Sequence, residues 1–355
     1  MLDYKFLNSK FYLAPSSLKL DTTGRFKVGN SVLSFDNFSL FFRSENTTKI
    51  LKFDFENLIK FAKENHCVKE VEEKIHSIIS KRHNIQGVSF KTPKVMGILN
   101  VTPDSFSDGG RYFSHENAIN HGKKLSNDGA AILDIGGESS RPGSNPISFS
   151  EEYNRVIPVV KALSKNILIS VDTNKSKVMS ESLKSGAKII NDVSSLTRDS
   201  KSLNIIKSSS CGVVLMHSKG LPVNMQDNPI YDDPILEIYD YLEDRVKICE
   251  KVGIEKKRII VDPGIGFGKN DFHTKRIFRY LNLFHGLGCV LLVGSSRKSF
   301  IGRWSKIKDN QDRIGGSIAS ALWAINSGVN ILRAHDVSPT LQAINIWTAI
   351  AEKES

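Results

Sequence analysis

From Lys94 onward, short apolar runs alternate eight times with longer stretches that mix apolar and polar residues. The apolar runs, such as Asn166–Asp172, are nearly continuous, which is typical of strands with both faces buried. Ser150, followed by two glutamates, is the predicted N-cap of the second helix. Strands are predicted near residues 95–100, 131–136, 167–172, 188–193, 213–217, 258–263, 289–294 and 329–335. Helices are predicted near residues 115–128, 151–164, 175–185, 199–208, 234–252, 272–284, 312–327 and 338–352.

Strict alternation of strands and helices requires a parallel sheet, and eight such units close most simply into a barrel. The predicted fold class is therefore α/β, with a (β/α)8 TIM barrel. A doubly wound open sheet is the alternative, and it is disfavoured because polar residues follow almost every predicted strand. Four connections on that carboxyl end are long, which is typical of binding loops: residues 101–114, 137–149, 218–233 and 295–311.

Residues 1–90 lack this alternation. They hold a β-like run at Ser31–Phe42, an amphipathic helix near Phe55–Lys63 and a more charged helix at Val68–Ser80. No cluster of polar side chains in this region suggests catalysis. We therefore predict a small N-terminal α+β appendage of unknown function at residues 1–90, packed on a barrel domain of residues 91–355. A partner-binding module or a separate activity is the alternative for the appendage.

Composition narrows the possible partners. The formal net charge is +11, and residues 1–91 contribute +5 of it (15 Lys and Arg against 10 Asp and Glu), so the excess is spread along the chain. This charge suits an anionic small substrate, and the chain has no nucleic-acid-binding motif, so we expect no nucleic-acid partner. No run of 18 uncharged apolar residues exists, so we expect no membrane partner either.

The compartment is predicted from the cysteines and from the first residues of the chain. The four cysteines lie far apart and form no Cys-x-x-Cys pair, which indicates reduced thiols rather than disulfides or a zinc cluster. The first thirty residues lack a basic segment followed by an apolar one, so export is not expected. A cytoplasmic location is predicted, and an organelle presequence is less firmly excluded.

Acidic and amide side chains mark three neighbouring strand ends. Asp172 and Asp262 each end an apolar run, and Asn191 lies near the end of a strand between them. A carboxylate there can accept two parallel hydrogen bonds from an amidine-like N–H pair, and the amide can donate and accept beside it. The trio therefore suits a flat heterocycle with a 2-amino-4-oxo edge. The alternative is that these acids cap helices or form structural ion pairs.

Positive side chains follow the second, seventh and eighth strands. Cations that converge on one rim are costly without an anion among them, and a diphosphate is the natural candidate. Asn100, at the end of the first strand, offers a neutral oxygen ligand for a Mg²⁺ ion that would bridge the phosphates. The cationic set is Arg141, Arg297, Lys298, Arg333 and His335.

The segment Gly264–Lys269 resembles a phosphate-binding loop but does not match its spacing. We interpret it as a tight turn beside the bound ring, with Phe267 as a stacking wall. Met216 and His217, with Met225 and Gln226 in the fifth loop, are expected to line the same pocket. No Ser–His–Asp spacing, histidine-rich metal set or activated cysteine is evident, so covalent and zinc chemistry are disfavoured.

Four segments resemble the dihydropteroate synthases, the folate-pathway enzymes targeted by sulfonamides. They occur in the family's order within residues 94–350: 100–110 (Asn-Val-Thr-Pro-Asp-Ser-Phe-Ser-Asp-Gly-Gly), 134–143 (Asp-Ile-Gly-Gly-Glu-Ser-Ser-Arg-Pro-Gly), 262–269 and 296–302. The resemblance implies a TIM barrel that is usually a homodimer. It also implies a transferase that joins 6-hydroxymethyl-7,8-dihydropterin diphosphate to 4-aminobenzoate, releases pyrophosphate and uses Mg²⁺.

The same resemblance assigns the site residues. It assigns the pterin edge to Asp172, Asn191, Asp262 and Lys298, with Met216 nearby. It assigns the diphosphate to Asn100, which would also bind the Mg²⁺, and to Ser140, Arg141, Arg333 and His335. It places the aminobenzoate near Phe106, Arg141, Pro142, Phe267 and Ser296. The implied catalytic residues are Lys298, Arg333, His335 and Arg141.

Two departures from the family pattern are visible. Ser140 replaces the usual Thr and keeps the hydroxyl, and Ala334 replaces the usual Val between Arg333 and His335. Two other functions stay open at this point. One is a pterin-barrel methyltransferase that passes a methyl group to a corrinoid, and the other is a catalytically silent pterin-binding scaffold.

Overall fold

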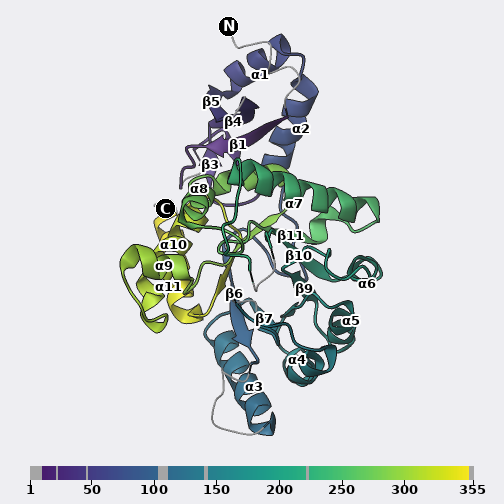
Figure 1. The fold of residues 1–355 in the computed structure, drawn as a ribbon. Coiled ribbons are helices and arrows are strands. Elements are labelled where there is room, and N and C mark those ends of the chain that lie inside the picture. The colour runs from purple at the N-terminus through teal and green to yellow at the C-terminus, as the bar shows by residue number, and fades with distance from the viewer. Residues whose placement is uncertain are drawn as a thin grey trace.

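The computed structural model describes residues 10–20, 23–44, 47–102, 111–139, 143–220 and 224–351. Eight parallel strands form a closed barrel in which the last strand pairs with the first (Figure 1). The predicted α/β barrel is therefore confirmed. In chain order the barrel strands are β6 (Lys94–Asn100), β7 (Ile132–Gly136), β8 (Ile169–Asp172), β9 (Ile189–Asp192), β10 (Gly212–Met216), β11 (Ile259–Asp262), β12 (Val290–Val293) and β13 (Ile331–Ala334).

Helices connect these strands, and most of them lie close to their predicted positions. They are α3 (Arg111–Asn127), α4 (Phe149–Leu163), α5 (Ser176–Lys184), α6 (Ser202–Lys207), α7 (Pro234–Lys251), α8 (Asp271–Arg279), α9 (Ser299–Ser305), α10 (Ile314–Asn326) and α11 (Val337–Ala351). Short 3₁₀ helices lie at η3 (Lys256–Arg258), η4 (Leu281–Leu287) and η5 (Gln311–Arg313).

Three local predictions were wrong. The single helix predicted near 272–284 is divided into α8 and η4, and the loop after β12 contains the unpredicted α9. Ser148, not Ser150, is the N-cap of α4, because its side chain accepts the backbone N–H of Glu151 at 3.1 Å. An acceptor three residues before a backbone donor is the spacing that caps a helix, and Ser150 lies inside the first turn instead.

Side chains inside the barrel change from apolar to polar along the strands. Asp134 lies two residues beyond Ile132, and Arg333 lies two beyond Ile331, so each pair shares the inner face of its strand. The amino-terminal end of the interior is filled by buried apolar side chains: Ile85, Phe90, Met96, Ile132, Ile189, Val214, Ile260, Val290, Leu292 and Ile331. Polar chemistry is thereby confined to the carboxyl end.

The N-terminal module, which we define as the described part of residues 10–90, is a small α+β unit as predicted. Its main sheet has the order β1-β4-β5 and is antiparallel. The helices match the sequence-based prediction, whereas β1 and β5 were not predicted. The elements are β1 (Phe11–Ser16), β2 (Phe26–Lys27), β3 (Ser34–Phe35), β4 (Asn37–Ser44), β5 (Thr47–Asp54), α1 (Phe55–Glu64) and α2 (Val68–Ile79).

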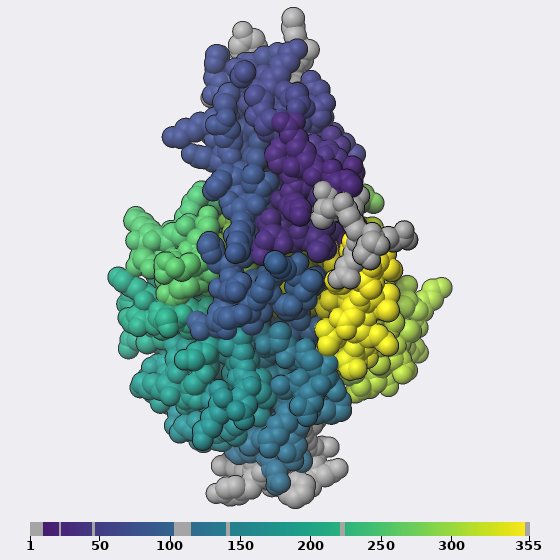
Figure 2. Space-filling model, turned by 180° about the vertical axis from the view of Figure 1, so that it is seen from behind, coloured from purple at the N-terminus to yellow at the C-terminus, as the bar shows by residue number. Residues whose placement is uncertain are grey.

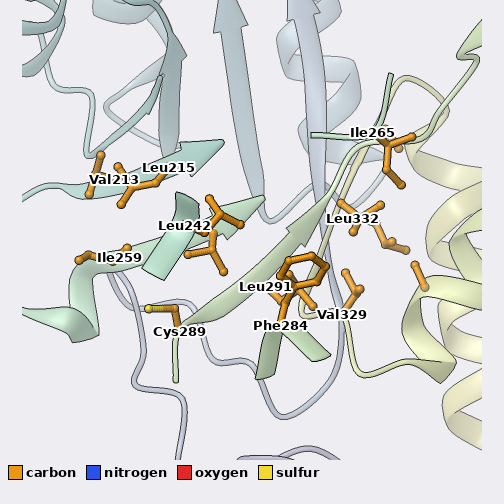
Figure 3. Packing of buried hydrophobic residues seen from close by; sticks show 14 of the residues in the cluster. Val213, Leu215, Leu242, Ile259, Ile265, Phe284, Cys289, Leu291, Val329 and Leu332 are labelled. Atoms are coloured by element: carbon orange, nitrogen blue, oxygen red, sulfur yellow. The ribbon is translucent and has the colours of Figure 1, made fainter. Parts of the chain in front are cut away.

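The module is packed directly on the barrel. In Figure 2 its purple and blue residues lie against one side of the barrel, where β1 and α2 pack on η4. It has an apolar core of its own, but Tyr12, Ala14, Leu33 and Phe41 belong to the main cluster that surrounds the barrel strands. Figure 3 shows part of this main cluster, with Leu242 of α7 and Phe284 of η4 among side chains of β10, β11 and β12. The two parts therefore share apolar contacts, and the predicted boundary near residue 90 stays a prediction.

Two further observations bear on the compartment. Among the described residues, no helix is long and apolar enough to cross a membrane. All four cysteines are free, and three of them, Cys211, Cys249 and Cys289, are buried. The cytoplasmic location stays a prediction.

Candidate active site

The predicted site residues that the structure describes all lie at or just after the carboxyl ends of barrel strands. Adjacent strands bring them into register, because Asp172 pairs with Asn191 across β8 and β9, and Met216 pairs with Asp262 across β10 and β11. The same end carries Asn100, Phe267, Ser296, Lys298, Arg333 and His335. Phe106, Ser140, Arg141 and Pro142 lie outside the described residues.

Arg333 is the centre of a buried ionic network. Its Nε donates to Asp134 Oδ2 at 2.6 Å, and its Nη2 donates to Asp172 Oδ2 at 3.0 Å. Asn191 Nδ2 donates to the same Asp134 oxygen at 2.9 Å. The network therefore joins β7, β8, β9 and β13 across the barrel interior. Arg333 is not the unpaired rim cation that the sequence argument assumed, because two carboxylates already neutralise it.

Asp134 was missed in the sequence. Its side chain is fully buried, and Oδ1 has no hydrogen-bond partner within the described part of the chain. The signal was available, because Asp134 stands at an inward position of an apolar strand, two residues after Ile132. A buried carboxylate at such a position needs a cationic partner, and Arg333 supplies it.

Burial changes the charge equilibria of this network. It raises the pKa of Asp172, which the nearby Arg333 opposes and the negative charge of Asp134 reinforces. Burial alone would lower the pKa of Arg333, but the two carboxylates carry it above its usual value, so the guanidinium stays charged. Two acids that share one fixed cation leave Asp172 more easily protonated than an ordinary aspartate.

Lys298 and Asp262 carry opposite charges that influence each other in the same part of the site. Burial lowers the pKa of Lys298 to about 8, although Asp262 opposes the shift. Burial likewise raises the pKa of Asp262, and the positive charge of Lys298 opposes it. The Lys298 ammonium lies 4.6 Å from the ring centroid of Phe267 and donates to the carbonyl of Ile265. Lys298 and Phe267 thus lie together.

The loop between β11 and α8 is a tight turn that depends on glycine. Gly264, Gly266 and Gly268 all have positive φ. A Cβ on Gly264 would lie 1.9 Å from the carbonyl oxygen of His217, and one on Gly268 would lie 2.2 Å from that of Lys219. Larger residues are therefore excluded, and the backbone of this loop approaches the β10–α7 loop closely.

Lys269, another residue that the sequence argument did not single out, holds this loop in place. Its buried amine lies 2.9 Å from His217 Nδ1 and donates to the carbonyl oxygens of Phe267 at 2.9 Å and His217 at 3.3 Å. Burial lowers the pKa of His217 well below its usual value, with Lys269 adding to the shift. His217 is therefore a neutral wall residue, in agreement with the sequence-based interpretation.

One member of the predicted cationic set lies elsewhere. Arg297, at a φ of 58°, donates to Asp336 at 2.9 Å and also bonds Gln311. Its charge is thus used in a structural ion pair, and its assignment to the anion-binding set was wrong. His335 remains at the mouth of the barrel, where its backbone N–H donates to Ser296 Oγ at 3.1 Å.

The amide oxygen of Asn100 suits a hard cation that takes most of its other ligands from water and substrate. Asn100 pairs with Gly136 at the carboxyl ends of β6 and β7 and provides one amide oxygen. Within the described ranges, no group of three or more His, Cys, Asp or Glu side chains could hold a metal ion. Mg²⁺ is commonly held by one or two protein oxygens together with water and substrate phosphates, so Asn100 fits this ion.

Comparison with known proteins identifies the family. The pterin binding enzyme family matches residues 96–335. The dihydropteroate synthase of Escherichia coli (strain K12) is 45% identical over 266 residues, which are 74% of this chain and 94% of that protein. The chain belongs to the dihydropteroate synthase family.

Solved structures agree with this assignment. The Yersinia pestis dihydropteroate synthase, solved with a sulfonamide drug complex, has a TM-score of 0.71 and 41% identity, and the match covers 76% of this chain and 98% of that one. The Xanthomonas albilineans dihydropteroate synthase in complex with 7,8-dihydropteroate has a TM-score of 0.67 and 36% identity, and the match covers 75% of this chain and 96% of that one. The pterin-binding barrel is therefore shared with the family, and the N-terminal module lies mostly outside the shared region.

The pKa shifts predict how pterin affinity depends on pH. The family resemblance assigns ring N–H groups to the Asp172 carboxylate, and on that assignment affinity should fall as the pH drops through its raised pKa. Affinity should also fall as the pH rises through about 8, where Lys298 loses its charge. Calorimetric titration with a pterin across this pH range measures both the fall of affinity at low pH, the acidic limb, and the fall at high pH, the basic limb. The variant Asp172→Asn should lack the acidic limb and keep the basic one, and an unchanged acidic limb would contradict the assignment.

Proposed function

We propose that this chain condenses (7,8-dihydropterin-6-yl)methyl diphosphate with 4-aminobenzoate to give 7,8-dihydropteroate and diphosphate. The observation that carries the proposal is the grouping of acids and bases at one end of the barrel. Asp172, Asn191 and Asp262 present acceptors for a flat ring, and Lys298 and Arg333 lie beside them. Membership of the dihydropteroate synthase family supports the same reaction.

The acids hold the ring and stabilise the charge that develops on it. Asp262 and Asp172 accept N–H groups of the pterin, and Asn191, oriented by its bond to Asp134, can use its amide oxygen as an acceptor. Lys298 donates to the ring carbonyl or ring nitrogen on the opposite edge. When the bond to the leaving group lengthens, positive charge appears on the exocyclic carbon and the ring, and the two carboxylates favour it.

The bases stabilise the leaving group. The C–O bond to the diphosphate breaks and its electron pair leaves with the diphosphate, so negative charge grows near Arg333 and His335 at the end of β13. Asp134 and Asp172 occupy Nε and one N–H of Nη2, so Arg333 would contact the diphosphate with its remaining N–H groups. The amine of 4-aminobenzoate then forms the C–N bond with its own lone pair, and it releases one proton to the diphosphate or to water. No strong general base is needed, which agrees with the neutral, hydrogen-bonded state of His217.

The family resemblance assigns the remaining contacts. The aminobenzoate would lie near Phe267 and Ser296, with Phe106, Arg141 and Pro142 from the loops after β6 and β7. Asn100 would bind the Mg²⁺, and Ser140 and Arg141 would contact the diphosphate. When bound, the Mg²⁺ neutralises charge on the diphosphate oxygens.

A coupled pyrophosphate-release assay tests this reaction. The wild-type chain, mixed with both substrates and Mg²⁺, should release one pyrophosphate for each dihydropteroate formed, and chelation of the metal should lower the rate. Asp172→Ala or Lys298→Ala should cut turnover about a hundredfold or more, as loss of a transition-state contact typically does. Exposed Lys184, which pairs with Glu181 on the same helix, offers a control in Lys184→Ala, which should keep wild-type turnover.

Two results would contradict the proposal. Pterin binding without pyrophosphate release would favour a silent scaffold. Transfer of a methyl group from methyltetrahydrofolate to a corrinoid would favour the methyltransferase alternative, which has no use for the cations Lys298, Arg333 and His335.

We also propose that the chain forms a homodimer through the outer faces of α10 and α11. These neighbouring helices expose Trp323 (57%), Ile346 (60%) and Ile350 (72%), which is unusual for large apolar side chains on a monomer surface. Sedimentation velocity should show a dimer for the wild type and a monomer for Ile346→Glu. The control Ile248→Glu, on the outer face of α7, should stay dimeric. A monomeric wild type would exclude this interface.

A further inference from the structure

The sheet of the N-terminal module is bonded to the middle of α7. The hydroxyl of Tyr12 donates to Asp240 at 2.9 Å, and Arg43 donates both to that hydroxyl at 2.8 Å and to Asp240 at 2.9 Å. Lys10 adds an ion pair with Glu243 at 2.7 Å. Burial and the Asp240 carboxylate raise the pKa of Tyr12, so it remains a donor. Hydrogen bonds and an ion pair therefore join the module to α7, in addition to apolar contacts.

A second bonded contact lies at the start of α7, nearer the active site. The hydroxyl of Thr48 on β5 donates to Asp233 Oδ2. Asp233 is the N-cap of α7 and accepts the backbone N–H of Ile235 at 2.9 Å through its other oxygen. Arg276 of α8 donates to Asp233 Oδ2 at 2.7 Å. One carboxylate therefore joins β5 of the module to two barrel helices.

Both helices continue directly into the pterin side of the site. Residues 224–233 lead into α7, and the loop Gly264–Asn270 leads into α8. The two segments are bonded to each other, because Gln226 Nε2 donates to the carbonyl of Gly266 at 2.6 Å and the Tyr231 hydroxyl donates to that of Gly268 at 2.8 Å. The loop they hold contains Phe267, which lies under the Lys298 ammonium.

We propose that the N-terminal module is an intramolecular brace that positions the pterin side of the active site through Asp233. The inference rests on the proposed function and assigns a role to a region outside residues 96–335 that the family shares. Thr48 is a positioning residue, since it acts through Asp233 and the start of α7. Without its hydrogen bond, α7 and the loops at its start can adopt arrangements in which the Gly264–Asn270 turn fits the ring less well. The fraction of binding-competent molecules then falls, and pterin affinity falls with it.

A single-atom change tests the brace better than deletion of the module. Deletion would expose part of the barrel core, because the main apolar cluster includes Tyr12, Ala14, Leu33 and Phe41. It would therefore change stability and the binding of both substrates together. Thr48→Val removes only the hydroxyl and suits a strand, whereas Thr48→Ser keeps the donor. Lys19→Met is a matched control, because its ion pair with Asp36 lies within the module and away from α7.

The measurements are the calorimetric Kd for the dihydropterin diphosphate, the KM for 4-aminobenzoate and the thermal midpoint. Thr48→Val should weaken pterin binding about threefold or more, within the range seen for changes along bonded networks. Because Phe267 of the same turn also faces the proposed aminobenzoate position, the KM for 4-aminobenzoate should rise as well, while the thermal midpoint stays at that of Lys19→Met. Thr48→Ser and Lys19→Met should bind the pterin as the wild type does.

Three outcomes would overturn the brace. They are wild-type pterin affinity in Thr48→Val, equal weakening in the Val and Ser variants, and weakening that comes with a thermal midpoint below that of Lys19→Met, which would indicate a merely structural role. Because the Kd does not depend on turnover, failure of the synthase reaction would appear separately, as pterin binding by the wild type without product.

Discussion

The site depends on one ionic arrangement, in which Arg333 crosses the barrel interior to pair with Asp134 and Asp172. Each of these charges would cost several kcal/mol if buried alone, so the three persist only together. Asn191 is oriented by the same Asp134 oxygen. Burial, reinforced by the negative charge of Asp134, raises the pKa of Asp172 and keeps it easily protonated. The arrangement is possible because buried apolar side chains fill only the amino-terminal end of the barrel interior. The carboxyl end is thereby left for polar side chains.

Much of this could be predicted from the sequence, since the governing signals are local. Continuous apolar runs such as Ile167–Asp172 indicate buried parallel strands, and a residue at a strand's carboxyl end must lie at the mouth of a closed barrel. That reasoning located Asp172, Asn191, Asp262 and Lys298 without any contact being known. The elements it missed depend on tertiary contacts: β1 is recognisable as a strand mainly through its pairing with β4, and η4 separates from α8 where the N-terminal module packs.

The errors in the site have a common physical origin. Sequence position shows that a charge is near the rim but not which partner it meets. Arg297, which has a positive φ, pairs with Asp336. Arg333 turns inward to Asp134, the buried first residue of the segment 134–143. Lys269 was overlooked for the opposite reason, since a lysine at the end of a glycine-rich loop is usually exposed, whereas here three acceptors surround its amine.

The most direct test of the central arrangement is the pH dependence of pterin binding in Asp134→Asn. The amide keeps the size of the side chain and an oxygen acceptor but removes the negative charge that raises the pKa of Asp172. The account predicts that the acidic limb of the affinity profile moves to lower pH, because Arg333 is then shared with one carboxylate fewer. An acidic limb at its wild-type position, with affinity otherwise unchanged, would contradict it.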